Sequence, residues 1–520
     1  MLPSGAAERA LVIMGPIAIG LLAIAAAAPG PASAEGLAVT NGWLTHDGMA
    51  VWGWVQHNGW WRAGQRPNLA RRSVGDPESD VRPNRTEDLD KLTDSMLRYG
   101  YPGFEHNFGL WYDRRRDAHD TAPREDANAV PPFLEQPWAK GEEGRATDGL
   151  PLYDLTKFND WYFGRLREFA ALCDRKGTVL FHKHHMQHAL LELDAHYVDF
   201  PWRPANCIQK TGLPHRVPAA NVYYDVSDPV RRDLHRLYIR QCLEATAEYT
   251  NVVHMIGQEY TGPLSYAEFW LDTVDEWEKE TGHDVLVSLS ATKDVVDAIL
   301  ADPRRSALVD IVDLRCFYLG VDGGLVAPRG GEEVPGRSTE CGQAQSDGSS
   351  PERICQKIRQ YRDAYPSKAI TDAIGQDRRQ TWAVLMAGGS MAVAGQIEYP
   401  DHADPPDYVR PANVDMVLPA YDFVRAHLAE ALPRMSPADI VLDAPERNWC
   451  LRSRGECYLV YALRGGGFRM DLTGDEGDFV AEWLDPRTGD LRPAGRVTAG
   501  QVAAFAAPDD QDWALWLHRP

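Results

Sequence analysis

The chain has 520 residues, of which 54 are Lys or Arg and 75 are Asp or Glu, so its formal net charge is −21. With 44% hydrophobic and 25% charged residues, the composition is that of a globular protein and excludes disordered, collagen-like and coiled-coil chains. The acidic excess argues against a nucleic-acid-binding surface, which needs clustered Lys and Arg, and against adhesion to anionic membranes. The length allows several domains, or one barrel with a smaller partner.

The first segment predicts a secretory signal peptide over residues 1–34. An almost wholly apolar run at residues 11–28 precedes PGPASA, in which Ala32 and Ala34 form the A-x-A pattern of a cleavage site. A signal peptide implies a secreted or periplasmic protein with no membrane attachment after cleavage. The alternative is an uncleaved anchor, since the apolar run approaches the ~20 residues that span a bilayer.

Beyond the signal, short apolar runs alternate with longer amphipathic segments. We expect strands within residues 50–56, 101–112, 178–182, 251–259, 284–290, 309–318, 368–373 and 391–397. We expect helices within residues 88–99, 157–176, 228–250, 265–281, 293–301, 351–364 and 377–387, with Gly177 as a C-cap and Asp228 and Ser265 as N-caps. Eight strand-then-helix units predict a parallel sheet and favour a closed (β/α)8 barrel over an open doubly wound sheet. An open sheet would usually carry a Gly-rich phosphate turn after its first strand, and none occurs.

The sequence pattern changes after a helix expected at residues 416–430. Residues 433–520 consist of short alternating runs separated by turns, which predicts an antiparallel β-sandwich. The fold class is therefore α/β, a (β/α)8 TIM barrel over residues 35–432 followed by a small β-sandwich over residues 433–520.

Eight cysteines are consistent with an oxidising compartment. Cys450 and Cys457 flank RSRGE, a predicted hairpin turn, so we expect a local disulfide between them. Cys341 and Cys355 flank a polar loop and could form a second one. No CxxC occurs, which argues against a zinc ribbon.

The candidate general acid lies where the fourth strand is expected to end, because (β/α)8 barrels place their chemistry at the carboxyl ends of strands. That strand runs into Gln258, Glu259 and Tyr260. A ring and a barrel wall desolvate a carboxyl group, which raises its pKa and lets it protonate a leaving oxygen. The position of Glu259 therefore predicts that it takes part in cleavage of a glycosidic bond. The alternative is that Glu259 is an ordinary loop carboxylate.

Glycoside hydrolysis normally needs a second carboxylate. Asp372 ends the seventh expected strand, and Glu398 follows the eighth. Either could act as nucleophile or base. The alternatives are a helix-start acid for Asp372 and a solvated loop residue for Glu398.

Polar and aromatic residues near the expected strand ends predict contacts with a sugar, which stacks on rings and hydrogen-bonds around its rim. The candidate substrate-binding residues are His106, Asn107, Trp111, Tyr112, His185, Gln187, His188, Trp202, Gln258, Tyr260 and Tyr318. A metal site is the rival interpretation, because His184 and His188 are four residues apart and would share one face of a helix. His185 stands where the HExxH motif has Glu, so we predict no metal and no cofactor.

Several segments resemble a secreted bacterial family known as glycoside hydrolases of polysaccharide-utilisation systems. They are EHNFGLWYDRRRDAH, FNDWYFGRLREFAALCDRKG, HMQHALLELDAHYVDFPWRPAN and QEYTGPLSYAEFWLDTVDEWEKETG. That family is distantly similar to retaining glycosidases of the large clan A, with catalytic acids on strands four and seven, and to apiosidase-like proteins. The segments FRMDLTGDEGDFVAEWLDPRTGDL and DWALWL resemble the β-sandwich labelled "collagen-binding" that follows such barrels.

The resemblance implies that Glu259 is the acid/base, with two departures from the clan. Gln258 stands where the clan usually has Asn, and Asp372 is the one nearby acid where apiosidase-like proteins carry Glu. The chain is thus predicted to be a secreted glycoside hydrolase acting on a plant or microbial polysaccharide or oligosaccharide by a two-carboxylate mechanism. Two alternatives stay open: a non-catalytic carbohydrate-binding barrel, and a metal-dependent hydrolase or lyase that uses His184 and His188.

Overall fold

The structure is a computed structural model. It describes residues 36–59, 89–106, 136–142, 144–146, 151–191, 197–198, 200–316, 318–319, 325–326, 350–375, 377–394 and 414–520. The expected signal peptide and its anchor alternative lie outside these residues. Within the described ranges, no helix has the length and apolar character needed to cross a bilayer.

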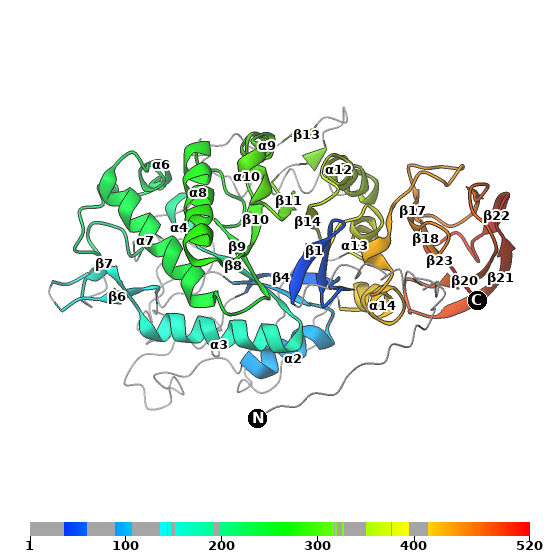
Figure 1. The fold of residues 1–520 in the computed structure, drawn as a ribbon, viewed down its shortest axis with the longest axis horizontal. Helices are drawn as coiled ribbons and strands as arrows, with labels where there is room; N and C mark the ends of the chain where they lie inside the picture. The colour runs from blue at the N-terminus through cyan, green and yellow to red at the C-terminus, as the bar shows by residue number, and fades with distance from the viewer. Residues whose placement is uncertain are drawn as a thin grey trace, which may run out of the picture. The chain divides into compact units, whose positions relative to one another are not determined.

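Eight parallel strands close into a barrel, each hydrogen-bonded to the next along the chain and the last to the first (Figure 1). They are β4 (Trp54–Gly59), β5 (Gly103–His106), β8 (Val179–Lys183), β9 (Val252–Met255), β10 (Leu286–Ser290), β11 (Ile311–Asp313), β14 (Ala369–Ala373) and β15 (Met391–Ala394). The eight expected strands and the (β/α)8 fold class are confirmed. The domain boundaries stay predictions.

The helices of the barrel units surround these strands. They are α2 (Leu89–Arg98), α3 (Asp160–Lys176), α7 (Pro229–Thr246), α8 (Leu264–Thr281), α9 (Lys293–Ala301), α12 (Pro351–Ala364) and α13 (Arg378–Met386). Gly177 ends α3 in the left-handed conformation, and the Asp228 carboxylate caps α7, as expected. The cap at Ser265 was wrong, because α8 begins one residue earlier, after Pro263, with no side-chain cap.

Shorter elements lie in the connections. They are β6 (Trp138–Lys140), β7 (Tyr153–Phe158), α4 (His188–Leu191), α6 (Ala220–Tyr223), α10 (Pro303–Ala307), β12 (Tyr318–Leu319), β13 (Leu325–Val326), α14 (Leu418–Phe423), a π-helical turn (Val424–Leu428) and 3-10 turns at Val414–Met416 and Leu432–Arg434.

Side chains alternate between the two faces of each barrel strand, as the period of two requires. Val179 and Phe181 of β8 belong to an apolar cluster inside the barrel, with Val55, Val253, Met255, Ile311, Ala369, Met391 and Val393. Leu180 of β8 packs outward in the larger cluster between strands and helices. This alternation decides which polar side chains reach the barrel lumen.

A small antiparallel sheet, unexpected from the sequence, closes the amino-terminal end of the barrel. It consists of β1 (Leu37–Thr40), β2 (Trp43–His46) and β3 (Met49–Ala50). Leu37 and Leu44 join the apolar lumen cluster, and the Leu44 N–H donates to Ser390 Oγ at 2.7 Å. The carboxyl ends of the strands therefore form the end where a site can open.

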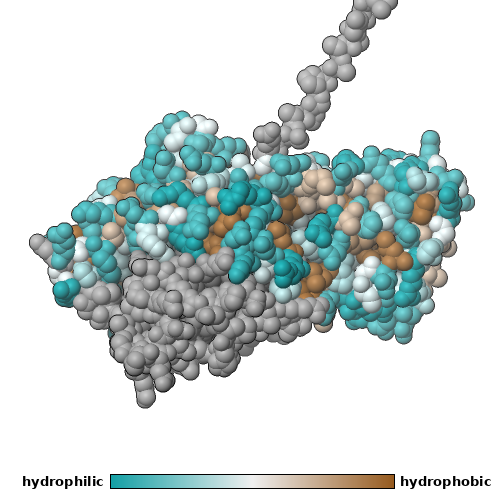
Figure 2. Space-filling view, turned by 90° about the horizontal axis from the view of Figure 1, so that it is seen from below, coloured by the Kyte–Doolittle hydropathy of each residue, from teal (hydrophilic) through white to brown (hydrophobic). Residues whose placement is uncertain are grey.

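The carboxy-terminal region is an antiparallel β-domain, as expected. Its six-stranded sheet has the order β16 (Ser436–Pro437), β17 (Asn448–Ser453), β18 (Cys457–Ala462), β23 (Trp513–His518), β20 (Asp478–Leu484), β21 (Leu491–Thr498). A second sheet pairs β19 (Gly467–Asp471) with β22 (Val502–Ala506), and a shared apolar core lies between the two. On the face shown in Figure 2, hydrophilic residues dominate the described surface and apolar ones form small patches.

The expected disulfide between Cys450 and Cys457 was wrong. In the register of β17 and β18, Cys450 lies opposite Val460, and Cys457 lies opposite Ser453. Cys450 packs in the core between the two sheets, whereas Cys457 belongs to the barrel-side cluster, and both thiols are free. Cys355 is also a free thiol, and Cys341 lies outside the described residues.

Candidate active site

Four charged side chains converge in the lumen at the carboxyl ends of the strands. Glu105 belongs to β5, Lys183 ends β8, Asp313 ends β11 and Arg315 follows it, and all four are at least 96% buried. The register pairs Glu105 with Phe181, which faces the lumen, so the Glu105 carboxylate faces it too. Charges are rarely buried this deeply unless they are paired.

The four groups form one continuous ion-pair network. Arg315 contacts both carboxylates, with its Nε 2.6 Å from Asp313 Oδ2 and its guanidinium bonded to both Glu105 oxygens. Lys183 Nζ lies 3.3 Å from Glu105 Oε2 and also donates to Gln258 Oε1. Each carboxylate therefore has a cation to offset its desolvation.

The pKa values of the two cations of the network, Lys183 and Arg315, shift in opposite directions. Burial lowers the pKa of Lys183 to about 8, with Arg315 adding to the shift and the carboxylates of Glu105 and Glu259 opposing it. Burial alone would also lower the pKa of Arg315, but Asp313 and Glu105 outweigh it and hold that pKa well above its usual value. Glu259 is thus close enough to Lys183 to influence its charge.

Glu259 follows β9 in a turn that is held by several hydrogen bonds. Its backbone has a positive φ of 51°, a conformation that non-glycine residues rarely adopt. The Glu259 N–H donates to Ser290 Oγ at 3.0 Å, and the Gln187 amide donates to the Glu259 carbonyl. Glu259 is partly exposed, whereas Gln258 and Tyr260 on either side are buried.

Gly257 lets the chain enter this turn. A Cβ at this position would lie 2.8 Å from the His185 carbonyl oxygen, which is closer than real Cβ atoms come. The same two segments are joined by a backbone hydrogen bond of 2.8 Å from His185 N to Ile256 O. Only glycine allows this close approach without a shift of the backbone.

The structure does not bring Asp372 into the lumen. Thr371 pairs with the lumen-facing Asp313, so Asp372 points to the other side of β14. There its oxygens lie 2.7 and 2.8 Å from Lys357 Nζ of α12 in a buried ion pair. Burial raises the pKa of Asp372, and Lys357 opposes that rise. Glu398, the other expected carboxylate, lies outside the described residues.

The expected substrate-binding residues that the structure describes are mostly packing and scaffold residues. His106 points outward from β5 against Tyr162, and Trp202 stacks on His235 at 4.5 Å between ring centroids. His185 and Tyr260 are buried and hydrogen-bonded, with the Tyr260 hydroxyl donating to Pro263 O at 2.8 Å. Gln187 and Gln258 contact the candidate site directly, through Glu259 and Lys183. The placements of Asn107, Trp111 and Tyr112 and of the side chains of His188 and Tyr318 lie outside the described structure.

Glu105, Lys183, Asp313 and Arg315 were missed as site residues by sequence reasoning. A signal was present, because each lies within or directly after an expected strand and at an even spacing from a lumen-facing residue. Glu105 is two residues after Gly103, and Lys183 two after Phe181. Counting by twos from the apolar positions would have placed all four in the lumen.

Solved structures share this fold at low sequence identity. A protein described as "Glycoside hydrolase" aligns at 12% identity with a TM-score of 0.54, over 93% of this chain and 97% of that chain. A glycoside hydrolase family 5 protein from Bacteroides vulgatus ATCC 8482 aligns at 13% identity with a TM-score of 0.53, over 93% of each chain. At such identities the likeness establishes the fold. The comparison with curated proteins found no match.

The closed barrel, with its charged network at the carboxyl ends of the strands, defines a (β/α)8-barrel protein with an appended antiparallel β-domain. The chain belongs to the family described as "Domain of unknown function (DUF6298)", whose model matches residues 22–404. A second model, "Putative collagen-binding domain of a collagenase", matches residues 439–518. The resemblance noted for the carboxy-terminal segments is therefore confirmed.

Proposed function

We propose that this protein is a secreted or periplasmic glycoside hydrolase in which Glu259 protonates the glycosidic oxygen of a carbohydrate. The observation that carries the proposal is the position of Glu259 after the fourth strand of a closed barrel. There it is partly exposed between buried neighbours and acts electrostatically on a buried lysine. Barrels of this kind place catalytic groups at this end. The glycoside hydrolase fold of the structural neighbours supports the same class.

Glu105 is the described residue that best fits the second carboxylate. It bonds to Lys183, which in turn is within electrostatic reach of Glu259, so one cation connects the two acids. Arg315 and Lys183 favour the ionised form of Glu105, which a nucleophile or base requires. Asp372 is not carried into the proposal because it faces α12, and Glu398 stays a prediction.

In the proposed reaction, the Glu259 carboxyl gives its proton to the leaving oxygen as the glycosidic bond breaks. The second carboxylate attacks the anomeric carbon directly, or removes a proton from the attacking water. A separation of ~5–5.5 Å between the two carboxyl groups in the substrate complex gives retention, and ~6.5–9.5 Å gives inversion.

The test is turnover of a panel of plant and microbial polysaccharides and oligosaccharides, followed by reducing-end analysis. We expect Glu259→Gln to reduce kcat about 10²–10⁴-fold on a panel member that the wild type hydrolyses, because general acid catalysis contributes about that factor. Glu280→Gln is the matched control, since Glu280 is exposed on α8 and pairs with Arg240. Full activity in folded Glu259→Gln protein would refute the assignment.

A non-catalytic carbohydrate-binding barrel is the second candidate, and β14 favours it. The lumen-facing residues of that strand are Ala369, Thr371 and Ala373, so the strand offers no carboxylate where clan relatives are expected to have one. Calorimetric sugar binding without product release from any panel member would favour this function. The metal-dependent hydrolase or lyase is not carried forward, because His184 lies on the helix side of the barrel wall, against Trp270 of α8 and away from the lumen where a substrate would bind.

A further inference from the structure

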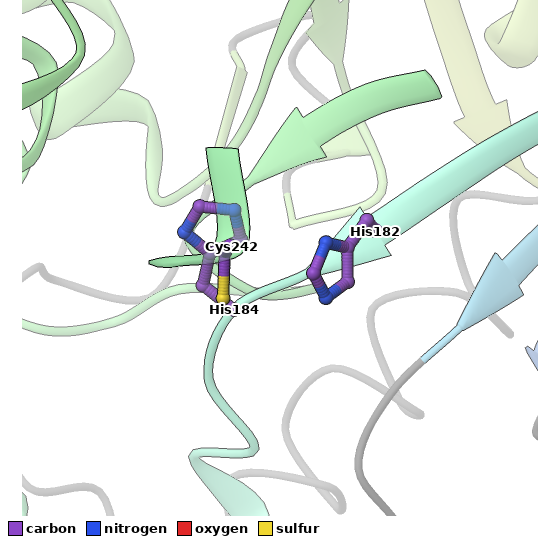
Figure 3. Close-up of side chains that lie close together, drawn as sticks. All are labelled: His182, His184 and Cys242. Carbon is purple, nitrogen blue, oxygen red and sulfur yellow. The ribbon is translucent and has the colours of Figure 1, made fainter. Parts of the chain in front are cut away.

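Two imidazoles and a thiol meet behind the barrel wall, on the side of β8 and β9 that faces the helices. His182 belongs to β8, His184 follows that strand, and Cys242 reaches them from α7 (Figure 3). One nitrogen or sulfur atom from each residue lies within 4.8 Å of the others, and all three residues are buried. This cluster is separate from the charged network in the lumen.

His182 is the unexplained member of the cluster. Its side chain is fully buried, yet neither ring nitrogen has a hydrogen-bond partner among the described residues. Buried polar groups are nearly always satisfied, and an exception calls for an ion or a water. An imidazole always carries one donor and one acceptor when neutral, so His182 leaves both unmet.

The core histidines His185 and His235 are hydrogen-bonded at both ring nitrogens, whereas His182 is bonded at neither among the described residues. His185 Nδ1 lies 2.9 Å from the Tyr223 hydroxyl, and His185 Nε2 lies 2.6 Å from the Tyr266 hydroxyl. His235 is held by Tyr266 and by the Tyr223 carbonyl. The fold thus supplies partners to buried imidazoles elsewhere.

The hydrogen bonds of His184 assign its tautomer. Trp270 Nε1–H donates to His184 Nδ1 at 3.1 Å, so the proton is on Nε2 and faces His254 Nδ1 at 3.0 Å. A ligating histidine normally donates its other N–H to such a partner. Coordination through Nδ1 would keep the bond to His254 and would cost only the hydrogen bond from Trp270.

We propose that His182, His184 and Cys242 bind a zinc ion that fastens α7 to the end of β8. Two nitrogen donors and one sulfur donor suit this borderline-soft ion. On binding, the Cys242 S–H bond breaks, its proton leaves to solvent, and the sulfur keeps the electron pair that it donates to the metal. The three residues supply three of the four ligands of a tetrahedral site. The site goes beyond the proposed glycosidase chemistry, whose residues lie on the other face of the strands.

The full chain is refolded from denaturant with Zn²⁺, freed of excess metal and analysed for bound metals. We expect a single zinc ion per chain in the wild type and in Cys173→Ala, and loss of the ion in Cys242→Ala. Cys173 is the matched control because its thiol is equally buried on α3 and lies outside the cluster. Zinc-free folded wild type, or full zinc content in Cys242→Ala, would overturn the proposal.

Cobalt gives a second test that does not depend on a variant that folds. Refolding the wild type with Co²⁺ should produce a thiolate-to-cobalt charge-transfer band in the near ultraviolet. A site without the Cys242 sulfur cannot give that band. Its absence from folded wild type would contradict the proposal whatever the variants do, and glycosidase assays on the same samples test the other proposal separately.

Discussion

At the scale of single residues, the backbone of the candidate acid Glu259 is held by hydrogen bonds at both its N–H and its carbonyl. Gln187 donates to the carbonyl of Glu259 and accepts from the N–H of Thr261 at 3.2 Å, so one amide spans the turn. Ser290 fastens the N–H of Glu259 from the neighbouring strand. These contacts offset the cost of a left-handed residue, which is about 1–3 kcal/mol.

Removing this amide should misplace the acid without unfolding the protein. For Gln187→Ala we expect kcat to fall up to about 10²-fold while KM changes little, because small misplacements act on the chemical step. Gln209→Ala is the control, since Gln209 bonds to Asp154 and Leu155 away from the lumen. Equal losses in both variants would show that Gln187 acts only on stability.

The buried ion-pair network makes a second prediction at this scale. Arg315→Met leaves Glu105 and Asp313 without their shared cation, and breaking a buried pair in this way costs about 3–5 kcal/mol. Urea unfolding should show this loss in the free energy of unfolding. The double variant Arg315→Met with Glu105→Gln should recover part of it, and no recovery would argue against the pairing.

At the scale of secondary-structure elements, β8 and β9 position the candidate site together. The close contact between Gly257 and His185 sets the path of the chain two residues before Glu259. Gly257→Ala should lower the free energy of unfolding by roughly 1–3 kcal/mol, as overpacking does. Thermal unfolding measures this, and activity should fall as well.

Gly164→Ala provides the contrasting substitution. Gly164 lies inside α3, where an added Cβ meets only the end of the Arg167 side chain at 4.0 Å. Helix propensity predicts a gain of about 0.5–1 kcal/mol there. If both alanines had the same effect, the close approach at Gly257 would not be the cause.

Expected elements and found elements agree where local pattern decides them. Alternating apolar runs and helical segments predicted all eight barrel strands, and Asp228 with Pro229 predicted the start of α7. The amino-terminal sheet β1–β3 was missed because its short strands are stabilised by contacts with the barrel. Leu37 and Leu44 pack against lumen residues that lie far away in the sequence. The cap of α8 was missed because Pro263 ends the preceding turn without a side-chain cap.

At the scale of the whole molecule, the barrel and the β-domain are joined by specific polar contacts. Asp512 accepts two hydrogen bonds from Arg378 of α13, at 2.7 and 2.9 Å, and one from the Tyr461 hydroxyl at 2.8 Å. Trp382 of α13 stacks on Tyr461 with ring planes 2° apart. These contacts tie the β-domain to the final helix before β15.

The buried histidines predict that the whole protein loses stability in mild acid. Burial lowers the pKa of His235 to about 3 and that of His185 well below its usual value. At pH values between these lowered pKa values and the unfolded histidine pKa of ~6.5, the unfolded chain binds more protons than the folded protein. The free energy of unfolding is therefore highest above pH ~6.5 and falls as the pH drops below it. Each such histidine costs up to about 1.4 kcal/mol per pH unit.

Urea unfolding at pH 7 and pH 5 measures this effect. We expect a much lower free energy of unfolding at pH 5, and a shallower pH dependence in His235→Gln than in the wild type. Equal stability at both pH values would contradict the prediction.

Local patterns in the chain were enough to predict the order and type of the barrel elements, the antiparallel character of the last domain, and the place of Glu259 after the fourth strand. These follow from local periodicity and turn chemistry, which act over a few residues. The face that each strand residue takes follows from the folded barrel, because it depends on the register between neighbouring strands. The tertiary structure placed Asp372 against α12, put Cys450 and Cys457 on opposite sides of one sheet, and brought Arg315 to Glu105 across 210 residues of chain. Such contacts arise from barrel closure, which no local segment contains.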